Sequence, residues 1–406
     1  MKAAVTILVF CVAALLALGM VMLYSSSMAQ VGARYLVMQL VWCGLGLIMC
    51  VTAAVLDYRL LKRVAWPLLA VAVVLLTLVL ERHIGARING ARRWLILGSF
   101  RFQPSELAKL ALVIVLAWYG EHYQRQMPMW KRGIVIPGLF IAVVMGLIFV
   151  EPDRGTTVLV ASVSGMMLLV AGVQWKYLVP PALAGLAGLG ISLLHDPMRI
   201  KRIFGWLYLE ENKSGVGYQA YQAMLALGSG GWMGLGLGNG RQKLGFVPEH
   251  HTDFILAIIG EELGLIATVL VVAAFLAIVV CGIYIAWRAR DTFGLLLGSG
   301  ATFLIGLQAA INIGVVTSAL PNKGLPLPFI SYGGSNLLAM LVSVGLLLSI
   351  ARRARPLESI LPSPDDGEGL LLAHSRGNPF RRPGEQSQNL HCTFGTSSRP
   401  RAAHLV

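Results

Sequence analysis

The chain has 406 residues, of which 56% are hydrophobic and only 13% are charged. A soluble globular protein needs more polar side chains to cover its core, so this composition excludes that class. The formal net charge is +14, which in a soluble protein would suggest a nucleic-acid partner. Here the charges lie in segments between apolar runs. That placement favours contact with anionic lipid, and we expect no nucleic-acid partner.

Apolar runs of about 20 residues recur along the chain, which is the length at which an α-helix spans a bilayer. Helices are required there because lipid offers backbone polar groups no other partner. The sequence therefore predicts an all-α polytopic membrane protein with about ten transmembrane helices. We place the spans at 4–24, 35–56, 65–81, 105–119, 134–150, 155–173, 177–194, 254–286, 293–316 and 329–351.

One long polar segment, 195–253, separates the seventh and eighth spans, and a second, 354–406, follows the last span. The second segment is rich in Pro, Ser, Arg and Gly and has few apolar clusters, so we expect a disordered basic tail. The chain thus divides into a ten-span membrane domain, 1–353, with 195–253 as its outer loop, and a cytoplasmic tail, 354–406.

Lysines and arginines in the short loops predict the orientation of the spans. An even number of spans puts both ends on one side. The short loops on that side carry more basic residues once the long loop is left out, so both termini are expected in the cytoplasm. The outer segments are nevertheless strongly basic. We infer that they serve an anionic ligand held near the outer membrane surface.

The outer segment 82–104 carries Arg92, Arg93 and Trp94. A solvated basic loop with an interfacial tryptophan anchor would explain these residues without a ligand. Glu106 and Lys109 follow, three residues apart on one face of the next span. As a buried pair they would neutralise each other. The sequence leaves open whether this pair is purely structural or belongs to a site.

Glu151 and Asp153 put two carboxylates at the outer end of a helical hairpin. Asp153 would need no function if it caps the following helix. Two acids beside outer arginines would also order a site or hold a divalent cation. Both interpretations stay open.

The segment 228–243 is dense in glycine and ends with Lys243. It lacks the Walker spacing and a flanking strand, so a nucleotide site is not expected. One alternative is a flexible loop without a ligand. The other is a mobile or membrane-grazing element whose backbone amides and Lys243 approach a phosphate group.

Glu249, His251 and Asp253 close the long outer segment directly before an apolar run. So many candidate ligands within five residues cannot easily surround one metal ion. Asp253 fits the N-cap of the next helix. It would also serve as a general base that removes a proton from an acceptor hydroxyl. Further on, three prolines and Gly324 predict a rigid non-helical crossing with Lys323 at its apex.

Four motif blocks in this layout resemble the SEDS family (shape, elongation, division and sporulation), over about residues 1–353. The blocks are Gly90–Trp94 with Phe102–Glu106; Glu151–Asp153 with Gly155 and Thr156; Gln242–Leu244 with Pro248, Glu249 and His251–Phe254; and Lys323–Gly324 with Leu327, Pro328 and Ile330–Ser335. Gly90–Trp94, Gln242–Leu244, Gly260–Glu262 and Lys323–Gly324 are more similar to the division-type branch, FtsW, than to the rod-elongation branch, RodA.

The resemblance implies a peptidoglycan glycosyltransferase that polymerises lipid II at the outer face of the bacterial inner membrane, at the division septum. It implies that Asp253 is the catalytic base. The candidates to hold the leaving pyrophosphate are Arg92, Arg93, Arg101, Lys243 and Lys323. Other candidate substrate-binding residues are Trp94, Gln103, Ser105, Glu249, His251 and Ser331. The candidates that shape the cavity are Glu106, Lys109, Glu151 and Asp153.

The resemblance also implies a class B penicillin-binding protein, a transpeptidase, and other divisome proteins as partners. A divalent cation, Mg²⁺ or Mn²⁺, would suit the pyrophosphate, although no ligand set declares itself. The alternatives are a lipid II flippase, an elongation-type polymerase and a scaffold that positions the transpeptidase. Short inner loops and an acid–base grouping on one side favour the enzyme over the flippase.

Overall fold

The computed structural model describes residues 1–27, 32–81, 85–88, 91–98, 100–194, 197–215, 217–246, 251–322 and 324–354. Glu249, Lys323 and all but the first residue of the predicted tail therefore lie outside the described residues.

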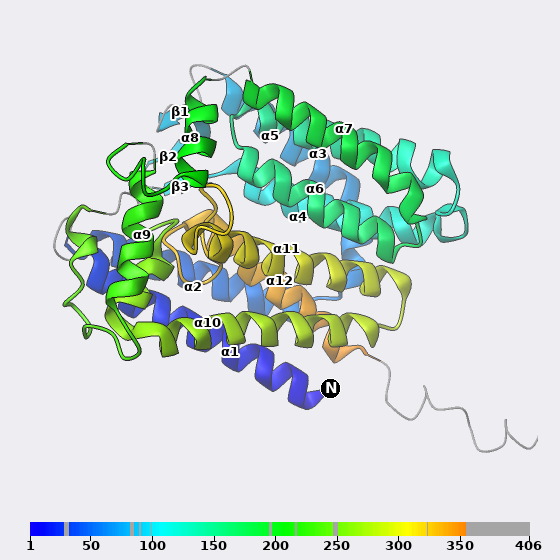
Figure 1. Cartoon of the computed structure of the whole chain (residues 1–406). Helices are drawn as coiled ribbons and strands as arrows, with labels where there is room; N and C mark the ends of the chain where they lie inside the picture. Colours follow the sequence, from blue (N-terminus) through cyan, green and yellow to red (C-terminus); the bar gives the residue numbers. More distant parts are fainter. Residues whose placement is uncertain are drawn as a thin grey trace, which may run out of the picture. The chain divides into compact units, whose positions relative to one another are not determined.

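The described part is mainly helical (Figure 1). Its α-helices are α1 (Lys2–Ser27), α2 (Arg34–Val55), α3 (Leu61–Leu80), α4 (Pro104–His122), α5 (Ile136–Val150), α6 (Arg154–Val170), α7 (Trp175–Leu194), α8 (Pro197–Leu207), α9 (Tyr218–Ser229), α10 (Ile255–Trp287), α11 (Thr292–Val316) and α12 (Gly334–Arg352). Short 3₁₀ turns lie at Tyr58–Leu60, Gln124–Gln126 and Gln242–Leu244, and a π-helical turn lies at Lys131–Val135.

Every predicted span coincides with one of these helices to within a few residues. Seven helices of the described part are long and apolar enough to cross a bilayer: α1, α2, α3, α5, α10, α11 and α12. The charged residues Glu106, Lys109 and Glu121 lower the apolar character of α4, and α6 has only 17 residues. The prediction of a helical polytopic membrane protein is confirmed, and the number of ten spans stays a prediction.

Helices α11 and α12 lie at the centre of the bundle, because 67% and 78% of their most apolar windows are buried, against 22% for α10. Helix α11 packs against α4, α6 and α10, whereas α12 packs against α2. The exposed apolar faces of the outer helices suit contact with lipid. The polar groups of α11 are therefore held inside protein, where they need partners.

The predicted basic loop at 82–104 contains a small sheet that the sequence analysis missed. Strands β1 (Gly85–Ile88), β2 (Ala91–Leu97) and β3 (Phe100–Phe102) pair antiparallel in the order β1-β2-β3. Gly85 pairs with Leu95, and Ile96 pairs with Arg101. The arginines obscured a strand-favouring run at 94–97. Gly98, directly after β2, has φ 62°, a backbone conformation that favours glycine.

The long segment 195–253 is also more ordered than a loop, because it contains α8 and α9. Helix α9 packs on α10 and α11. The indole N–H of Trp206 in α8 donates a 2.7 Å hydrogen bond to the carbonyl of Ser318. The sheet, α8 and α9 lie at the end of the bundle where α4, α6, α10 and α12 begin (Figure 1). The candidate residues gather at this end.

Candidate active site

Asp253 is half-buried in the turn that leads into α10. Phe254 occupies the N-cap position of α10, so the alternative in which Asp253 caps this helix is wrong. The backbone carbonyl of Asp253 accepts a 2.8 Å hydrogen bond from the side-chain amide of Asn312. A Cβ atom at Gly324 would lie 2.6 Å from Oδ2 of Asp253. The carboxylate therefore lies directly against this glycine.

Two amide side chains of α11 hold the crossing segment that follows Gly324. Asn312 donates to the carbonyl of Leu325 at 2.7 Å, and Gln308 donates to the carbonyl of Pro326 at 2.9 Å. Residues four apart share one face of a helix. This face of α11 thus fixes both the crossing segment and the backbone of Asp253. The described residues 317–328 are non-helical, as predicted, but α12 begins at Gly334, five residues later than the predicted start of the last span.

Glu106 and Lys109 of α4 form the predicted buried pair. Nζ of Lys109 lies 2.8 Å from Oε2 of Glu106, and their side chains are 0% and 4% exposed. Lys109 also donates to Oε1 of Gln308 at 3.0 Å, and Gln308 donates to Oδ1 of Asn336 at 2.8 Å. A continuous polar chain therefore runs from α4 through α11 to the start of α12.

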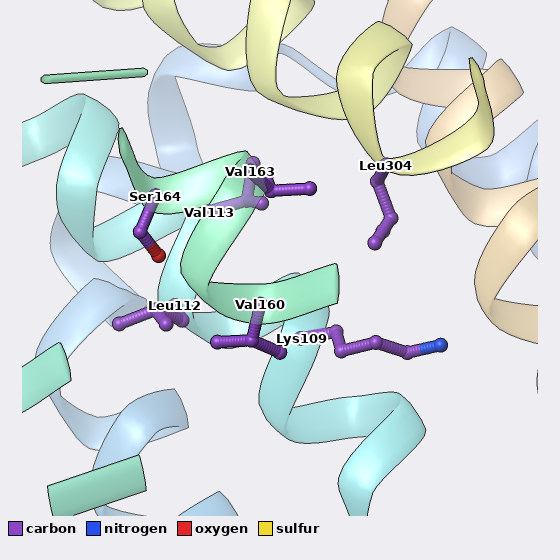
Figure 2. A pocket seen from close by; sticks show the side chains of 7 residues that line it. All are labelled: Lys109, Leu112, Val113, Val160, Val163, Ser164 and Leu304. Atoms are coloured by element: carbon purple, nitrogen blue, oxygen red, sulfur yellow. The ribbon is translucent and has the colours of Figure 1, made fainter. Parts of the chain in front are cut away.

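Lys109 also lines a small cavity of about 10 Å³ between α4, α6 and α11, which is about the volume that one water molecule needs. In Figure 2 the Lys109 side chain extends beside Val160, and its ammonium group points away from Ser164. The other lining residues are Leu112, Val113, Val163 and Leu304. The cavity is too small for a sugar.

Asp153 is buried, and it caps α6. Its carboxylate accepts from the backbone N–H of Thr156 at 3.1 Å and from the Thr156 hydroxyl at 3.0 Å. The amide of Gln103 reaches the same carboxylate at 3.4 Å. The structural alternative for Asp153 is therefore confirmed. The cap also ties α6 to the segment before α4.

Arg93 of β2 clamps the turn between α5 and α6. Its guanidinium donates to the carbonyls of Glu151 at 3.1 Å and Pro152 at 2.5 Å, and it lies 3.9 Å from the Asp153 carboxylate. Pro152 has φ 31°, an unusual conformation for proline. Arg93 thus stabilises a strained turn through hydrogen bonds to the backbone carbonyls of that turn. This geometry assigns Arg93 a structural role.

Glu151 is fully buried, and among the described residues neither of its carboxylate oxygens has a hydrogen-bond partner. Burial and the nearby Asp153 carboxylate raise the pKa of Glu151 from 4.5 to about 8, although Arg93 opposes this shift. The residue lines a cavity of about 280 Å³ together with Leu80, Arg87, Ala91, Arg92, Val150 and Pro152. An uncharged carboxyl group and two guanidinium groups therefore border one space.

Lys243 occupies a different place from the one predicted. It is 4% exposed, and its ammonium lies 2.6 Å from Oε1 of Glu262. It also donates to Oγ of Ser25 at 3.0 Å and to the carbonyl of Gly238 at 2.9 Å. An ammonium group has three N–H donors, and these three acceptors use them. The geometry assigns Lys243 a structural ion pair, which corrects its prediction as a pyrophosphate ligand.

The other candidates are spread along the same end of the bundle. Arg92 and Trp94 are half-buried on β2, and Arg101 is exposed on β3. The ring of His251 stacks on Tyr35 with centroids 4.8 Å apart. Ser105 is buried, and its Oγ finds no hydrogen-bond partner within the part of the chain that the structure describes. Ser331 is buried and accepts from the backbone N–H of Leu327 at 2.8 Å, so it closes a turn instead of facing a ligand.

Sequence reasoning missed Gln308, Asn312, Asn336 and Ser25. The spacing of Gln308 and Asn312 on an apolar helix was the available signal, because polar groups inside a span seek partners. Among the residues that the structure describes, no group of three or more His, Cys, Asp or Glu side chains could hold a metal ion. The divalent cation therefore stays an untested prediction.

Comparisons with known proteins agree with this architecture. A family model described as "Cell cycle protein", of the FtsW, RodA and SpoVE proteins, matches residues 6–356. The probable peptidoglycan glycosyltransferase FtsW of Trichlorobacter lovleyi is 38% identical over 351 residues, which cover 85% of this chain and 92% of that protein. Stage V sporulation protein E of Bacillus subtilis is 38% identical over 348 residues, which cover 84% and 95%.

Solved structures are similar over the same region. One is a chain of a peptidoglycan synthase complex described as coordinating polymerization and crosslinking. It has a TM-score of 0.72 and 31% identity, with 85% of this chain and 96% of that chain covered. Another is the rod shape determining protein RodA of Thermus thermophilus, with a TM-score of 0.64 and 32% identity, covering 86% and 97%.

Proposed function

Because the chain belongs to the FtsW/RodA/SpoVE family, we propose that it is a division-type peptidoglycan glycosyltransferase. Its substrate would be lipid II, a disaccharide-pentapeptide carried on undecaprenyl pyrophosphate, at the outer face of the bacterial inner membrane. The names of its FtsW relatives support this activity over the flippase and scaffold alternatives. The observation that carries the mechanism is the Asp253 carboxylate against Gly324, with its backbone held by Asn312.

In the proposed reaction, Asp253 accepts the proton of the acceptor GlcNAc 4-hydroxyl. The freed oxygen attacks C1 of the donor MurNAc, and the bond between C1 and the pyrophosphate oxygen breaks with inversion. The electron pair leaves on undecaprenyl pyrophosphate. A single displacement needs one base, in contrast to the two carboxylates of a retaining glycosidase. A base fixed through its backbone loses little orientational freedom when the acceptor arrives.

The cavity of about 280 Å³ lined by Arg87, Arg92 and Glu151 supports a place for the pyrophosphate. Two guanidinium groups supply donors in the forked geometry that phosphate prefers. A pKa of about 8 keeps Glu151 uncharged at neutral pH, so it does not repel the anion. Arg92 is therefore the first candidate to bind the pyrophosphate leaving group. Arg93 holds the backbone of Glu151 and Pro152 beside this cavity, whereas Lys243 is paired with Glu262 elsewhere.

The remaining parts of the proposal are a class B penicillin-binding protein as partner, other divisome proteins around it, and a place at the division septum with both termini cytoplasmic. The described match to a peptidoglycan synthase complex supports a transpeptidase partner. A Mg²⁺ or Mn²⁺ ion carried by the pyrophosphate is also part of the proposal. We assign the activity to residues 1–353.

Polymerisation of purified lipid II by the protein in vesicles, alone and with the transpeptidase, tests this function. We expect glycan strands that an endoglycosidase digests, and equal product from a chain truncated after residue 353. Translocation of fluorescent lipid II without polymer would contradict the proposal and support the flippase. Omitting or adding Mg²⁺ and Mn²⁺ in the same assay tests the cation.

A further inference from the structure

The glycine-rich segment 228–243 has a role that the proposed reaction does not use. It presents large apolar side chains to the outside of the protein: Trp232 is 73% exposed, Met233 80% and Leu237 55%. Single exposed apolar residues are ordinary, but a contiguous group marks a contact surface. The stretch 228–240 also contains no charged residue.

The segment lies alongside the apolar face of α10. The backbone N–H of Leu265 donates to the carbonyl of Gly231 at 2.9 Å, and the N–H of Ile266 donates to that of Trp232 at 3.4 Å. Helix α10 exposes Leu265 and Ile266, each at 46%, and then Val269 and Leu270 at 55% and 63%. The apolar surface of the segment therefore continues onto a helix that crosses the membrane.

The point at which the glycine-rich segment meets α10 indicates how deep its apolar surface lies in the membrane. The helix is broken at Gly264, where φ is 79° and ψ is −175°. From Leu265 to Trp287 it runs about 35 Å at ~1.5 Å per residue, slightly more than the ~30 Å hydrocarbon core. The break and the adjoining segment therefore lie at the edge of the hydrocarbon, on the side of Asp253. Tryptophan is enriched at this depth.

Irregular backbone is tolerated at this depth only when its polar groups have partners. The break in α10 supplies them, because the carbonyls of Glu261 and Glu262 accept hydrogen bonds from Leu235 and Gly236, each at 3.0 Å. The Glu262 carboxylate accepts from the N–H of Gly238 at 3.1 Å. These polar groups face α10, and the apolar side chains face away from it.

Glycines permit this close approach. A Cβ at Gly234 would lie 2.2 Å from the carbonyl oxygen of Glu262, and a Cβ at Gly264 would lie 2.4 Å from the nitrogen of Gly234. Both residues have φ of 79°. The ion pair between Lys243 and Glu262 then closes the segment against Ser25 of α1. The backbone N–H groups of Leu235, Gly236 and Gly238 and the Lys243 ammonium are thus directed toward α10 and α1.

We propose that residues 230–238 form a re-entrant loop whose side chains Trp232, Met233 and Leu237 lie among the lipid acyl chains of the leaflet on the side of Asp253. The loop anchors the segment between α9 and α10 at a fixed depth in the membrane. This anchoring role is independent of the proposed glycosyl transfer.

Photocrosslinking tests the loop directly. The photoreactive residue benzoylphenylalanine replaces Met233 in the full chain, reconstituted in phosphatidylethanolamine and phosphatidylglycerol vesicles. Lys213, which is exposed in a polar turn, receives the same residue as the matched control. We expect lipid adducts at position 233 several-fold above those at position 213. Equal yields at the two positions would overturn the proposal.

Two further outcomes keep the test decisive. In vesicles that also hold the transpeptidase, an adduct with that protein in place of lipid would show a protein-docking surface and overturn the proposal. If the Met233 variant fails to fold, quenching of tryptophan fluorescence by brominated lipids decides the matter. We expect Trp232→Phe to reduce the quenched fraction, whereas Trp206→Phe leaves it unchanged. No reduction in Trp232→Phe would contradict the loop.

Discussion

Asn312 joins Asp253 to the crossing segment: its side-chain amide donates to the backbone carbonyl of Asp253 at 2.8 Å and to that of Leu325 at 2.7 Å. One buried amide thus sets where the carboxylate lies relative to Gly324. The contact is made through the backbone and does not use the carboxylate oxygens. Asn312 is therefore a positioning residue, and its loss should displace the base without removing a direct contact to its carboxylate.

We expect Asn312→Leu to lower the kcat of lipid II polymerisation by about 10²-fold, the effect of a small misplacement of a reacting group. The pH dependence of kcat should stay as in the unaltered protein, because Asp253 is retained. The exposed Asn239→Leu is the control and should keep full activity. An unchanged kcat in Asn312→Leu would contradict the positioning role.

The pair of Glu106 and Lys109 should behave as a buried unit. Lys109→Met leaves an unpaired buried carboxylate and should lower the free energy of unfolding by about 3–5 kcal/mol. Adding Glu106→Gln should recover most of the loss. Lys62→Met breaks the half-exposed pair with Glu121 and should cost less than about 1 kcal/mol. Thermal unfolding in detergent measures all three; equal losses for Lys109→Met and Lys62→Met would contradict this account.

The raised pKa of Glu151 should make the stability of the protein depend on pH. Its pKa is about 8 in the folded protein against an ordinary 4.5, so between these values the folded chain holds a proton that the unfolded chain releases. Raising the pH therefore favours unfolding, by at most about 1.4 kcal/mol per pH unit. We expect thermal stability to fall from pH 5 to pH 8 and Glu151→Gln to flatten that decline. Glu210→Gln, at an exposed site, should retain it, and a decline that persists in Glu151→Gln would be contrary evidence.

Gly234 and Gly238 separate backbone strain from steric conflict in the glycine-rich loop. Both have positive φ, 79° and 85°, but only a Cβ at Gly234 meets another atom within 4 Å. Gly238→Ala should cost roughly 1–2 kcal/mol for the left-handed backbone alone. Gly234→Ala adds the clash with Glu262 and should cost about 1–3 kcal/mol more. Equal unfolding temperatures for the two variants would contradict the packing of the loop on α10.

The helices were predictable because each span is a long apolar run, and periodicity within one segment is visible in the sequence. The sheet was not predictable, because Arg92 and Arg93 interrupt the apolar pattern of β2. Contacts between distant segments were also hidden. Lys243 was read as a phosphate ligand because its partners, Ser25 and Glu262, come from two other elements.

In the candidate site too, roles set by local sequence were predictable and contacts with distant segments were not. Asp153 was recognisable as a helix cap from its local sequence, and the structure shows that cap. Asp253 looked like a cap as well, but Phe254 holds that position. The partners of Asp253 lie on α11 and in the crossing segment, about 60 to 70 residues further along the chain. Local patterns cannot identify such partners.

The most direct test of the central claim is the rate of lipid II polymerisation by Asp253→Asn. The asparagine keeps the shape of the side chain and removes the base, so we expect a loss of about 10²–10⁴-fold with unchanged lipid II binding. Asp57→Asn, which changes a carboxylate paired with Arg353 on the opposite end of the bundle, should keep the normal rate. Polymerisation by folded Asp253→Asn at the rate of the unaltered protein would contradict the assignment of Asp253 as the catalytic base.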